Sequence, residues 1–467
     1  MTDAHVEAIL ARLRPMVEDR PVILAGGPLA GMAPRLNAVR ILGARRPLCV
    51  AFGLGTGPIP TEEEAERFVV PQQEQPLLES IYEEMRLLAD PAPDLRAALD
   101  AYDPQCQAVV LAGPFMTSGD LAGRPVLDGR RPAWEALEDK TQSEALWDGA
   151  GIERAPSLVV PATGSRLRTA ARELDRGDGT VWAGDAREGF NGGSEFVRRV
   201  VDGDDESAAV DFFTAHCDRV RVMPFLDGIP TSIHGLVFPD GVAVFRPVEM
   251  VILRRPPDGP SGFVVGGLST WWDPPPADRE EMRASARRVG NHLRDAVDYR
   301  GGFSLDGILT RDGFRPTEVN PRFSSGLVTL VRSLPDLPLI AIQCALVSGA
   351  DPGVTADELE GLVVSAADKR RYGAAATLTT AVHPRETDAR RVVLDGQRYR
   401  VARDGEPDHG TLSLGPSAVG GLVRLDPDPT QLRPGTSLAP YAVAAFALAD
   451  EIWGTAIGPA LPAPSLR

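Results

Sequence analysis

The chain has 467 residues, of which 43 % are hydrophobic and 24 % are charged, and its formal net charge is -16. This length allows two or three domains, each with its own hydrophobic core. The acidic balance argues against DNA or RNA as the main partner, because binding a polyanion requires positive charge opposite its phosphates.

Residues 1–133 have the pattern of an α/β domain. The chain begins with a predicted amphipathic helix that acidic residues interrupt, which distinguishes it from a signal peptide. Short apolar runs then alternate with helical stretches, as is typical of a parallel sheet; the runs are 22–27, 48–55 and 108–115. Gly26, Gly27 and Gly31 follow the first run but do not form a complete dinucleotide fingerprint, so a tight strand-to-helix turn is the alternative to a phosphate cradle.

A second region begins at residue 134. Its sequence predicts a helix that contains Lys140 and ends at Gly149–Gly151, followed by a strand after Pro156. The next strand leads into a loop rich in glycine, where backbone N–H groups can approach oxygen atoms closely. A plain turn is the alternative for this loop, whose candidate residues are Gly189, Asn191, Gly192, Gly193 and Ser194.

Residues 219–238 predict a core strand that contains Met223, Phe225 and Leu226. Residues 242–256 predict a strand pair, whose charged side chains are Arg246, Glu249, Arg254 and Arg255. Because arginine binds carboxylates and phosphates bidentately, Arg246 or Arg254 could hold the carboxylate of a substrate, and Glu249 could contact a metal or an amine. A solvated charged face is the alternative. Residues 262–276 predict a loop that would cover the candidate site described next.

The most informative segment is 301–326, which predicts two strands joined by a turn at Asp312–Gly313. Asp306 lies in the first strand, while Glu318 and Asn320 lie on one face of the second. Arg322 comes just beyond them. Two carboxylates, an amide oxygen and a guanidinium suit a polyphosphate bound with Mg²⁺. A buried helix follows and ends at Gly349, and residues 365–467 predict a small appended α+β domain with a final helix.

This pattern resembles the ATP-grasp ligases, in which an Asp on one strand and Glu-x-Asn on the next hold magnesium on ATP. The resemblance covers roughly Trp134 to Gly349 and implies an ATP-grasp domain at 134–350. Its small lid half would span about 150–220 and its metal-binding half about 221–350. Residues 1–133 would then be a Rossmann-like pre-ATP-grasp domain, and 365–467 an appended C-terminal domain.

The resemblance also implies roles for individual residues. Asp306, Glu318 and Asn320 would bind Mg²⁺, Lys140 would reach the phosphates of ATP, and Arg322 would stabilise the transferring phosphate. The remaining nucleotide contacts would come from the loop and the hinge strand; they are Arg187, Gly189, Asn191, Gly192, Gly193, Ser194, Met223, Phe225 and Leu226. The chain departs from the family where a strand lysine usually stands, because Gly184 occupies that place. Arg187 is the candidate to replace it.

The implied activity is ATP-dependent coupling of a carboxylate to an amine through an acylphosphate. The layout and the segment WAGDAREGFNGG are also similar to pheganomycin-type peptide ligases of natural-product pathways. The expected partners are a small carboxylic acid and an amino acid or peptide, with no nucleic acid and no membrane, and the expected location is the cytoplasm. A ligase or carboxylase of primary metabolism and a nucleotide-binding protein without chemistry stay as alternatives, and the sequence leaves a homodimer open.

Overall fold

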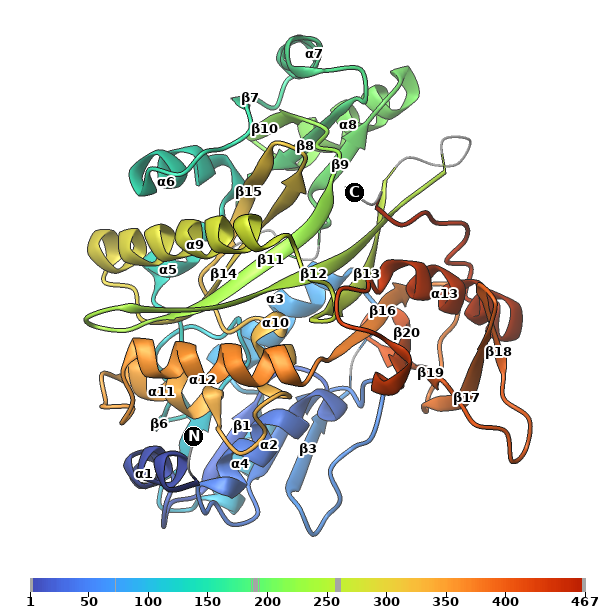
Figure 1. The fold of residues 1–467 in the computed structure, drawn as a ribbon. Coiled ribbons are helices and arrows are strands. Elements are labelled where there is room, and N and C mark those ends of the chain that lie inside the picture. The colour runs from blue at the N-terminus through green and yellow to red at the C-terminus, as the bar shows by residue number, and fades with distance from the viewer. Residues whose placement is uncertain are drawn as a thin grey trace.

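The computed structural model describes residues 3–71, 73–185, 187, 192, 194–256 and 262–463. Within these residues the chain forms a parallel sheet of four strands, an antiparallel sheet of four strands and an antiparallel sheet of ten strands (Figure 1). A two-stranded hairpin completes the sheets. The predicted mixture of α/β and α+β parts is therefore confirmed. No helix in the described part of the chain combines the length and the apolar character needed to cross a bilayer.

The N-terminal sheet has the order β3-β2-β1-β4, and all of its pairs are parallel. Its strands are β1 (Val22–Ala25), β2 (Leu48–Phe52), β3 (Glu66–Val70) and β4 (Val109–Leu111). β3 was not predicted because it is a charged, partly exposed strand at the edge of the sheet. The helices of this domain are α1 (Asp3–Leu13), α2 (Ala33–Ile41), α3 (Leu77–Ala89) and α4 (Pro93–Tyr102). The hairpin consists of β5 (Asp120–Leu121) and β6 (Arg124–Pro125).

The segment after residue 130 is a series of short helices rather than one helix. These are α5 (Pro132–Glu135), the 3₁₀ turns Ala136–Glu138 and Lys140–Gln142, and α6 (Ser143–Ala150). Gly151 ends α6 with a φ of 63°, a conformation that glycine adopts without strain. This arrangement places Lys140 at the start of a turn, where Asp139 accepts a hydrogen bond from the backbone N–H of Thr141.

The smaller antiparallel sheet has the order β7-β10-β8-β9 and packs on two helices. Its strands are β7 (Leu158–Pro161), β8 (Thr180–Gly184), β9 (Val197–Val200) and β10 (Arg219–Pro224), and the helices are α7 (Gly164–Leu174) and α8 (Gly203–His216). The core between them includes the fully buried Leu167, Trp182 and Phe213. This unit lies above the large sheet in Figure 1.

The large sheet begins with the order β15-β14-β11-β12-β13. These strands are β11 (Ile229–Val237), β12 (Val242–Arg254), β13 (Phe263–Ser269), β14 (Gly301–Thr310) and β15 (Gly313–Asn320). The predicted strand pair at 242–256 is wrong, because β12 is a single strand. The predicted loop at 262–276 is also wrong over Phe263–Ser269, because these residues form β13, which pairs with β12. The helices of this part are α9 (Pro276–Val297), α10 (Ser325–Val331), α11 (Leu339–Ser348) and α12 (Ala356–Lys369).

The C-terminal strands continue this sheet instead of forming one of their own. β16 pairs with β13, and the order runs on as β16-β20-β19-β17-β18. The new elements are β16 (Gly373–Thr379), β17 (Asp388–Asp395), β18 (Arg398–Val401), β19 (Gly410–Ser417), β20 (Gly420–Pro427) and α13 (Ala439–Trp453). This part also contacts the N-terminal domain, since Thr56 donates a hydrogen bond to the carbonyl of Pro416 at 3.1 Å.

The junction between β13 and β16 depends on Gly267, which pairs with Ala375 and has a φ of +118°. A Cβ atom at this position would lie 2.1 Å from the carbonyl oxygen of Ala374. We therefore expect Gly267→Ala to lower the free energy of unfolding by about 1–3 kcal/mol, through backbone strain and loss of the close strand approach. Thermal unfolding would measure this. Gly361→Ala on α12, where an added Cβ meets nothing within 4 Å, is the control and should be neutral or stabilising. Equal melting temperatures for the two variants would contradict the prediction.

Candidate nucleotide and metal site

The β14–β15 hairpin brings the three predicted metal ligands together. Asp306 is the direct cross-strand partner of Glu318, and Ser304 is the partner of Asn320. The side-chain amide of Asn320 donates hydrogen bonds to Asp306 Oδ2 at 2.9 Å and to Glu318 Oε1 at 3.4 Å. Because direct partners in an antiparallel pair share a face, the two carboxylates and the amide form one compact oxygen-rich cluster.

Strand β11 supports this cluster from the other side of β14. Ser232 is the cross-strand partner of Asp306, and its hydroxyl donates a hydrogen bond to Asp306 Oδ1. His234 Nδ1 lies 3.1 Å from the same hydroxyl oxygen. Burial lowers the pKa of His234 to about 3, so the ring is neutral at physiological pH. The sequence analysis missed Ser232 and His234. Their alternate positions on a strand place both side chains on one face, and this pattern could have identified them.

The charges in the cluster are unbalanced between the two carboxylates. Burial, and then the negative charge of Glu318, raise the pKa of Asp306 to about 7. Burial alone would raise the pKa of Glu318, but the ammonium group of Lys140 outweighs it, and the pKa of Glu318 is lowered. Lys140 Nζ lies 2.7 Å from Glu318 Oε2. The positive charge of Lys140 is therefore placed at Glu318, one of the two carboxylates.

A buried ion-pair network orients Arg322 at the edge of the cluster. Glu138 accepts hydrogen bonds from Arg322 and from Arg130; Glu138 and Arg130 are buried, and Arg322 is partly exposed. The guanidinium carbon of Arg322 also lies 5.1 Å from the centre of the Phe115 ring. The sequence analysis missed Glu138 and Arg130, because their partner lies more than 180 residues away along the chain.

The cluster opens into a cavity of about 780 Å³, a size that suits a small-molecule ligand. Lys140, Glu318, Asn320 and Arg322 line it together with Gly192 and Ser194 of the glycine-rich loop. The predicted loop residues Gly189, Asn191 and Gly193 lie outside the described residues. Strands β13 and β16 form the opposite wall, with Val264 and Thr377 among the lining residues.

Comparison with known proteins gives the fold of this arrangement. No family model matches the chain. The chain is 28 % identical to the phosphoribosylamine–glycine ligase of Streptomyces coelicolor over 155 residues, which are 32 % of this chain. The match spans 36 % of that protein, so it covers only about a third of the relative.

Several solved structures align over nearly the whole chain. The phosphoribosylamine–glycine ligase of Thermotoga maritima superposes with a TM-score of 0.53 at 13 % identity, covering 92 % of this chain and 96 % of that one. The N5-carboxyaminoimidazole synthase of Aspergillus clavatus, in complex with ADP and an aminoimidazole ribonucleotide, gives 0.51 at 12 % identity, with 93 % and 99 % covered. The chain has the ATP-grasp ligase fold.

In this ATP-grasp fold, the side of β8 that faces the site is the side of Ala183, not of Gly184. A Cβ atom on Gly184 would lie 2.4 Å from Cys217 Sγ, inside the core beneath α8. Ala183 belongs to the opposite row, where it pairs with Arg221 on β10 and with Val197 on β9. Val197 lines the cavity that holds Lys140. Arg221 is therefore a cation on the face of the small sheet that is directed toward the site.

Arg187, the candidate replacement for the strand lysine, follows β8 and makes its contacts at the end of α8. Its guanidinium is 3.0 Å from Asp218 Oδ1 and donates to the carbonyls of Ala215 and Cys217. It is exposed and does not line the described part of the cavity. These contacts join the loop to the end of α8 and do not support the predicted nucleotide contact.

The predicted hinge residues lie at the end of β10. Met223 is buried and pairs with Val181. The guanidinium carbons of Arg199 on β9 and Arg254 on β12 lie 4.0 Å and 4.8 Å from the centre of the Phe225 ring. Met223, Phe225 and Leu226 are not among the described residues that line the cavity, so their contact with an adenine ring stays a prediction.

The charged residues of β12 are not brought to the cluster. Arg246 is fully buried and donates hydrogen bonds to Asp273 and Asp368, while Arg254 pairs with Asp227 at 2.8 Å. Glu249 is also buried, and it accepts a hydrogen bond from the backbone N–H of Leu438 at the start of α13. The predicted substrate contact of Arg246 and the predicted metal or amine contact of Glu249 are not supported, because their charges are satisfied within the fold. Among the described residues, Arg254 lines neither this cavity nor a second cavity that lies beside it.

A structural role for Arg246 has a measurable consequence. Arg246→Met should lower the free energy of unfolding by about 1–3 kcal/mol, because the carbonyls of Ala367 and Trp272 lose their buried donor, whereas Asp273 and Asp368 keep other arginine partners. The folded fraction should bind MgATP with unchanged affinity. Calorimetric unfolding and titration with MgATP measure the two quantities. An unchanged melting temperature would contradict this structural role.

Proposed function

We propose that the protein is an ATP-dependent, ADP-forming ligase that activates a carboxylate as an acylphosphate and couples it to an amine. The observation that carries this proposal is the joint placement of Glu318, Asn320, Lys140 and Arg322 on one cavity, with Asp306 beside them as the cross-strand partner of Glu318. Acyl transfer of this kind depends mostly on positioning and on neutralising charge. These residues supply both.

The cluster fits Mg²⁺ and a polyphosphate. Hard oxygen donors are the preferred ligands of Mg²⁺, and Asp306, Glu318 and the amide oxygen of Asn320 are of that type. Within the described residues no group of three or more His, Cys, Asp or Glu side chains could hold a metal alone, so phosphate oxygens would complete the shell. When bound, Mg²⁺ would neutralise the phosphates that leave with ADP.

The chain's own residues would then act on the reacting groups. Arg322, held by Glu138, would bind the phosphoryl group while a carboxylate oxygen of the acid forms a bond to the γ-phosphorus and the bond to ADP breaks. The amine nitrogen would next attack the acyl carbon, releasing phosphate and one proton. Lys140 would move its charge from Glu318 to the phosphates. The cavity walls would exclude the water that hydrolyses an acylphosphate.

Arg221 would provide the positive charge that the strand lysine provides in other ATP-grasp ligases. It lies on the row that faces the site, and it contacts Glu144 at 2.5 Å and the carbonyl of Thr317 beside Glu318. In the described structure its Nη2 is buried without a hydrogen-bond partner, which leaves one donor for a ligand. Arg221 is not among the described residues that line the cavity, so the guanidinium would have to move to reach a phosphate.

We expect Arg221→Met to weaken MgATP binding by about tenfold, or about 1.4 kcal/mol. Titration calorimetry would measure the change. Arg219→Gln is the matched control, because Arg219 lies on the same strand but is exposed. Equal affinities for Arg221→Met and wild type would exclude a nucleotide contact by Arg221.

The finer proposal is that the product is a peptide bond formed in a natural-product pathway. It rests on the sequence resemblance to pheganomycin-type peptide ligases. Ligation in primary metabolism is the alternative that the match to the S. coelicolor ligase favours. Nucleotide binding without chemistry is the alternative that the missing strand lysine favours, and the intact cluster around Asp306 speaks against it.

Product analysis tests the proposal. The protein is incubated with MgATP and pooled carboxylic acids, amino acids and peptides, and the nucleotides and new amides are identified by mass spectrometry. The expected products are ADP, phosphate and one new amide. Formation of AMP and pyrophosphate would exclude the acylphosphate route. ATP binding without turnover across broad pools would favour a protein that binds nucleotide only.

Glu318→Gln should abolish turnover while the melting temperature changes little, because it removes one charge from the predicted metal site and keeps the side-chain shape. The control is Glu281→Gln, an exposed residue of α9, which should retain full activity. Near-normal activity of Glu318→Gln would refute its predicted role in metal binding.

A further inference from the structure

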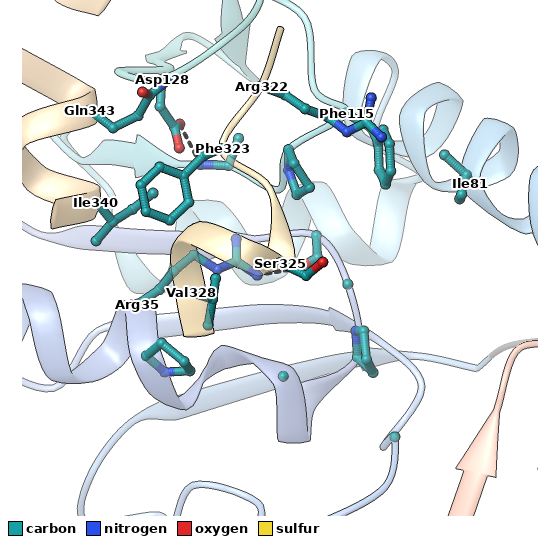
Figure 2. A pocket seen from close by; sticks show the side chains of 18 of the residues that line it. Arg35, Ile81, Phe115, Asp128, Arg322, Phe323, Ser325, Val328, Ile340 and Gln343 are labelled. Atoms are coloured by element: carbon teal, nitrogen blue, oxygen red, sulfur yellow. Dashed lines mark hydrogen bonds between the residues drawn. The ribbon is translucent and has the colours of Figure 1, made fainter. Parts of the chain in front are cut away.

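A second cavity of about 660 Å³ lies beside the nucleotide cavity. Its walls come from the turn after β1, from α3, from the segment that leads into α10, and from β16 and β20 (Figure 2). Arg322, Leu77, Leu378 and Leu422 line both cavities. A molecule in the second cavity would therefore meet an acylphosphate at Arg322, where the two cavities join.

The glycine-rich turn in this cavity is not a phosphate cradle. Phosphate binding at such turns requires backbone N–H groups that point at the ligand. Here every N–H group from Gly26 to Gly31 already donates within the protein, and Pro28 has none. Their acceptors are the carbonyls of Val50, Gly53, Leu54 and Pro28 and the carboxylate of Glu84. Glu84 itself places negative charge at the turn, which would repel a phosphate.

The charged groups at the end of this cavity near Arg35 favour a cation. Glu84 and Asp128 each use one oxygen to accept a backbone hydrogen bond, from Gly27 at 3.0 Å and from Ala112 at 2.7 Å. The guanidinium of Arg35 donates to the carbonyls of Ala25 and Gly26. At this end of the cavity two carboxylates therefore act on one arginine, while Arg130 and Arg322, which also line the cavity, share the carboxylate of Glu138. Burial raises the pKa of Asp128 to about 6, so both signs of charge are present near pH 7.

The rest of the lining is mostly apolar. Figure 2 shows Phe323, Val328 and Ile340 on one side of the cavity and Phe115 and Ile81 on another. Burial of an apolar body against such walls provides binding energy, while a few polar groups fix the orientation of the ligand. The volume accommodates a side chain together with a short length of peptide.

We propose that this second cavity binds the amine substrate, and that this substrate is an unphosphorylated primary amine on an apolar body, such as the N-terminal residue of a peptide with an apolar side chain. The ammonium group would lie beside Glu84 and Asp128, and the apolar side chain would pack against Phe323 and Val328. The assignment of the ligand as the amine substrate rests on the ligase activity proposed above.

Direct binding without nucleotide tests the ligand class. Titration calorimetry at about pH 7 compares L-phenylalaninamide, N-acetyl-L-phenylalaninamide and ribose 5-phosphate on the full-length protein. We expect phenylalaninamide to bind, the acetylated probe to bind at least tenfold more weakly because it lacks the ammonium group, and ribose 5-phosphate to bind more weakly still. Equal binding of the two amides, tighter binding of the sugar phosphate, or no binding of phenylalaninamide would overturn the proposal.

Variants locate the binding. Glu84→Gln keeps an acceptor for Gly27 but loses the charge, and it should weaken phenylalaninamide binding at least tenfold; Asp128→Asn is the second variant. Glu79→Gln, an exposed change on the same helix α3, should have no effect. Binding that is unchanged in both Glu84→Gln and Asp128→Asn would contradict the assignment. Glu318→Gln should bind the probe like wild type, so a failure of turnover is distinguished from a failure of this cavity.

Discussion

The repulsion between two carboxylates on adjacent strands is the constraint around which the site is built. Asp306 and Glu318 face each other across β14 and β15, and neither can leave this position without breaking the register of the hairpin. The fold tolerates this pair because Lys140, Asn320 and Ser232 each bring a hydrogen to it. Each of these donors comes from a different element. The interactions with the two carboxylates therefore connect the short helical segment, β11 and the hairpin.

Glu138 connects this cluster to the N-terminal domain. It lies between Arg322 and Arg130, and its two oxygens serve one guanidinium each. A buried carboxylate that is shared by two arginines leaves a net positive charge, which suits a site for phosphate. Because Arg322 also contacts Phe115 of the N-terminal domain, the orientation of this arginine depends on the packing of three parts of the chain.

The sequence predicted the parts of the site that are local in the chain. Asp306, Glu318 and Asn320 lie within one hairpin, where strand alternation and a two-residue turn determine which side chains meet. The sequence did not predict the parts of the structure that depend on partners far away in the chain. Arg246 resembles a surface charge until Asp273 and Asp368 enclose it, and β13 resembles a loop until β16, about a hundred residues later, pairs with it. The same holds for Ala183 and Gly184, whose opposite faces are decided by the packing of α8 against the small sheet.

The C-terminal strands therefore belong to the site in a way that their position in the chain does not indicate. β16 contributes Leu378 and β20 contributes Leu422 to the walls of both cavities. The proposed acylphosphate would have to be shielded from water until an amine reaches it, and apolar side chains at the junction of the two cavities would provide such shielding. Pairing β16 onto β13 fixes these leucines beside Arg322, so the extended sheet positions the place where the two substrates would meet.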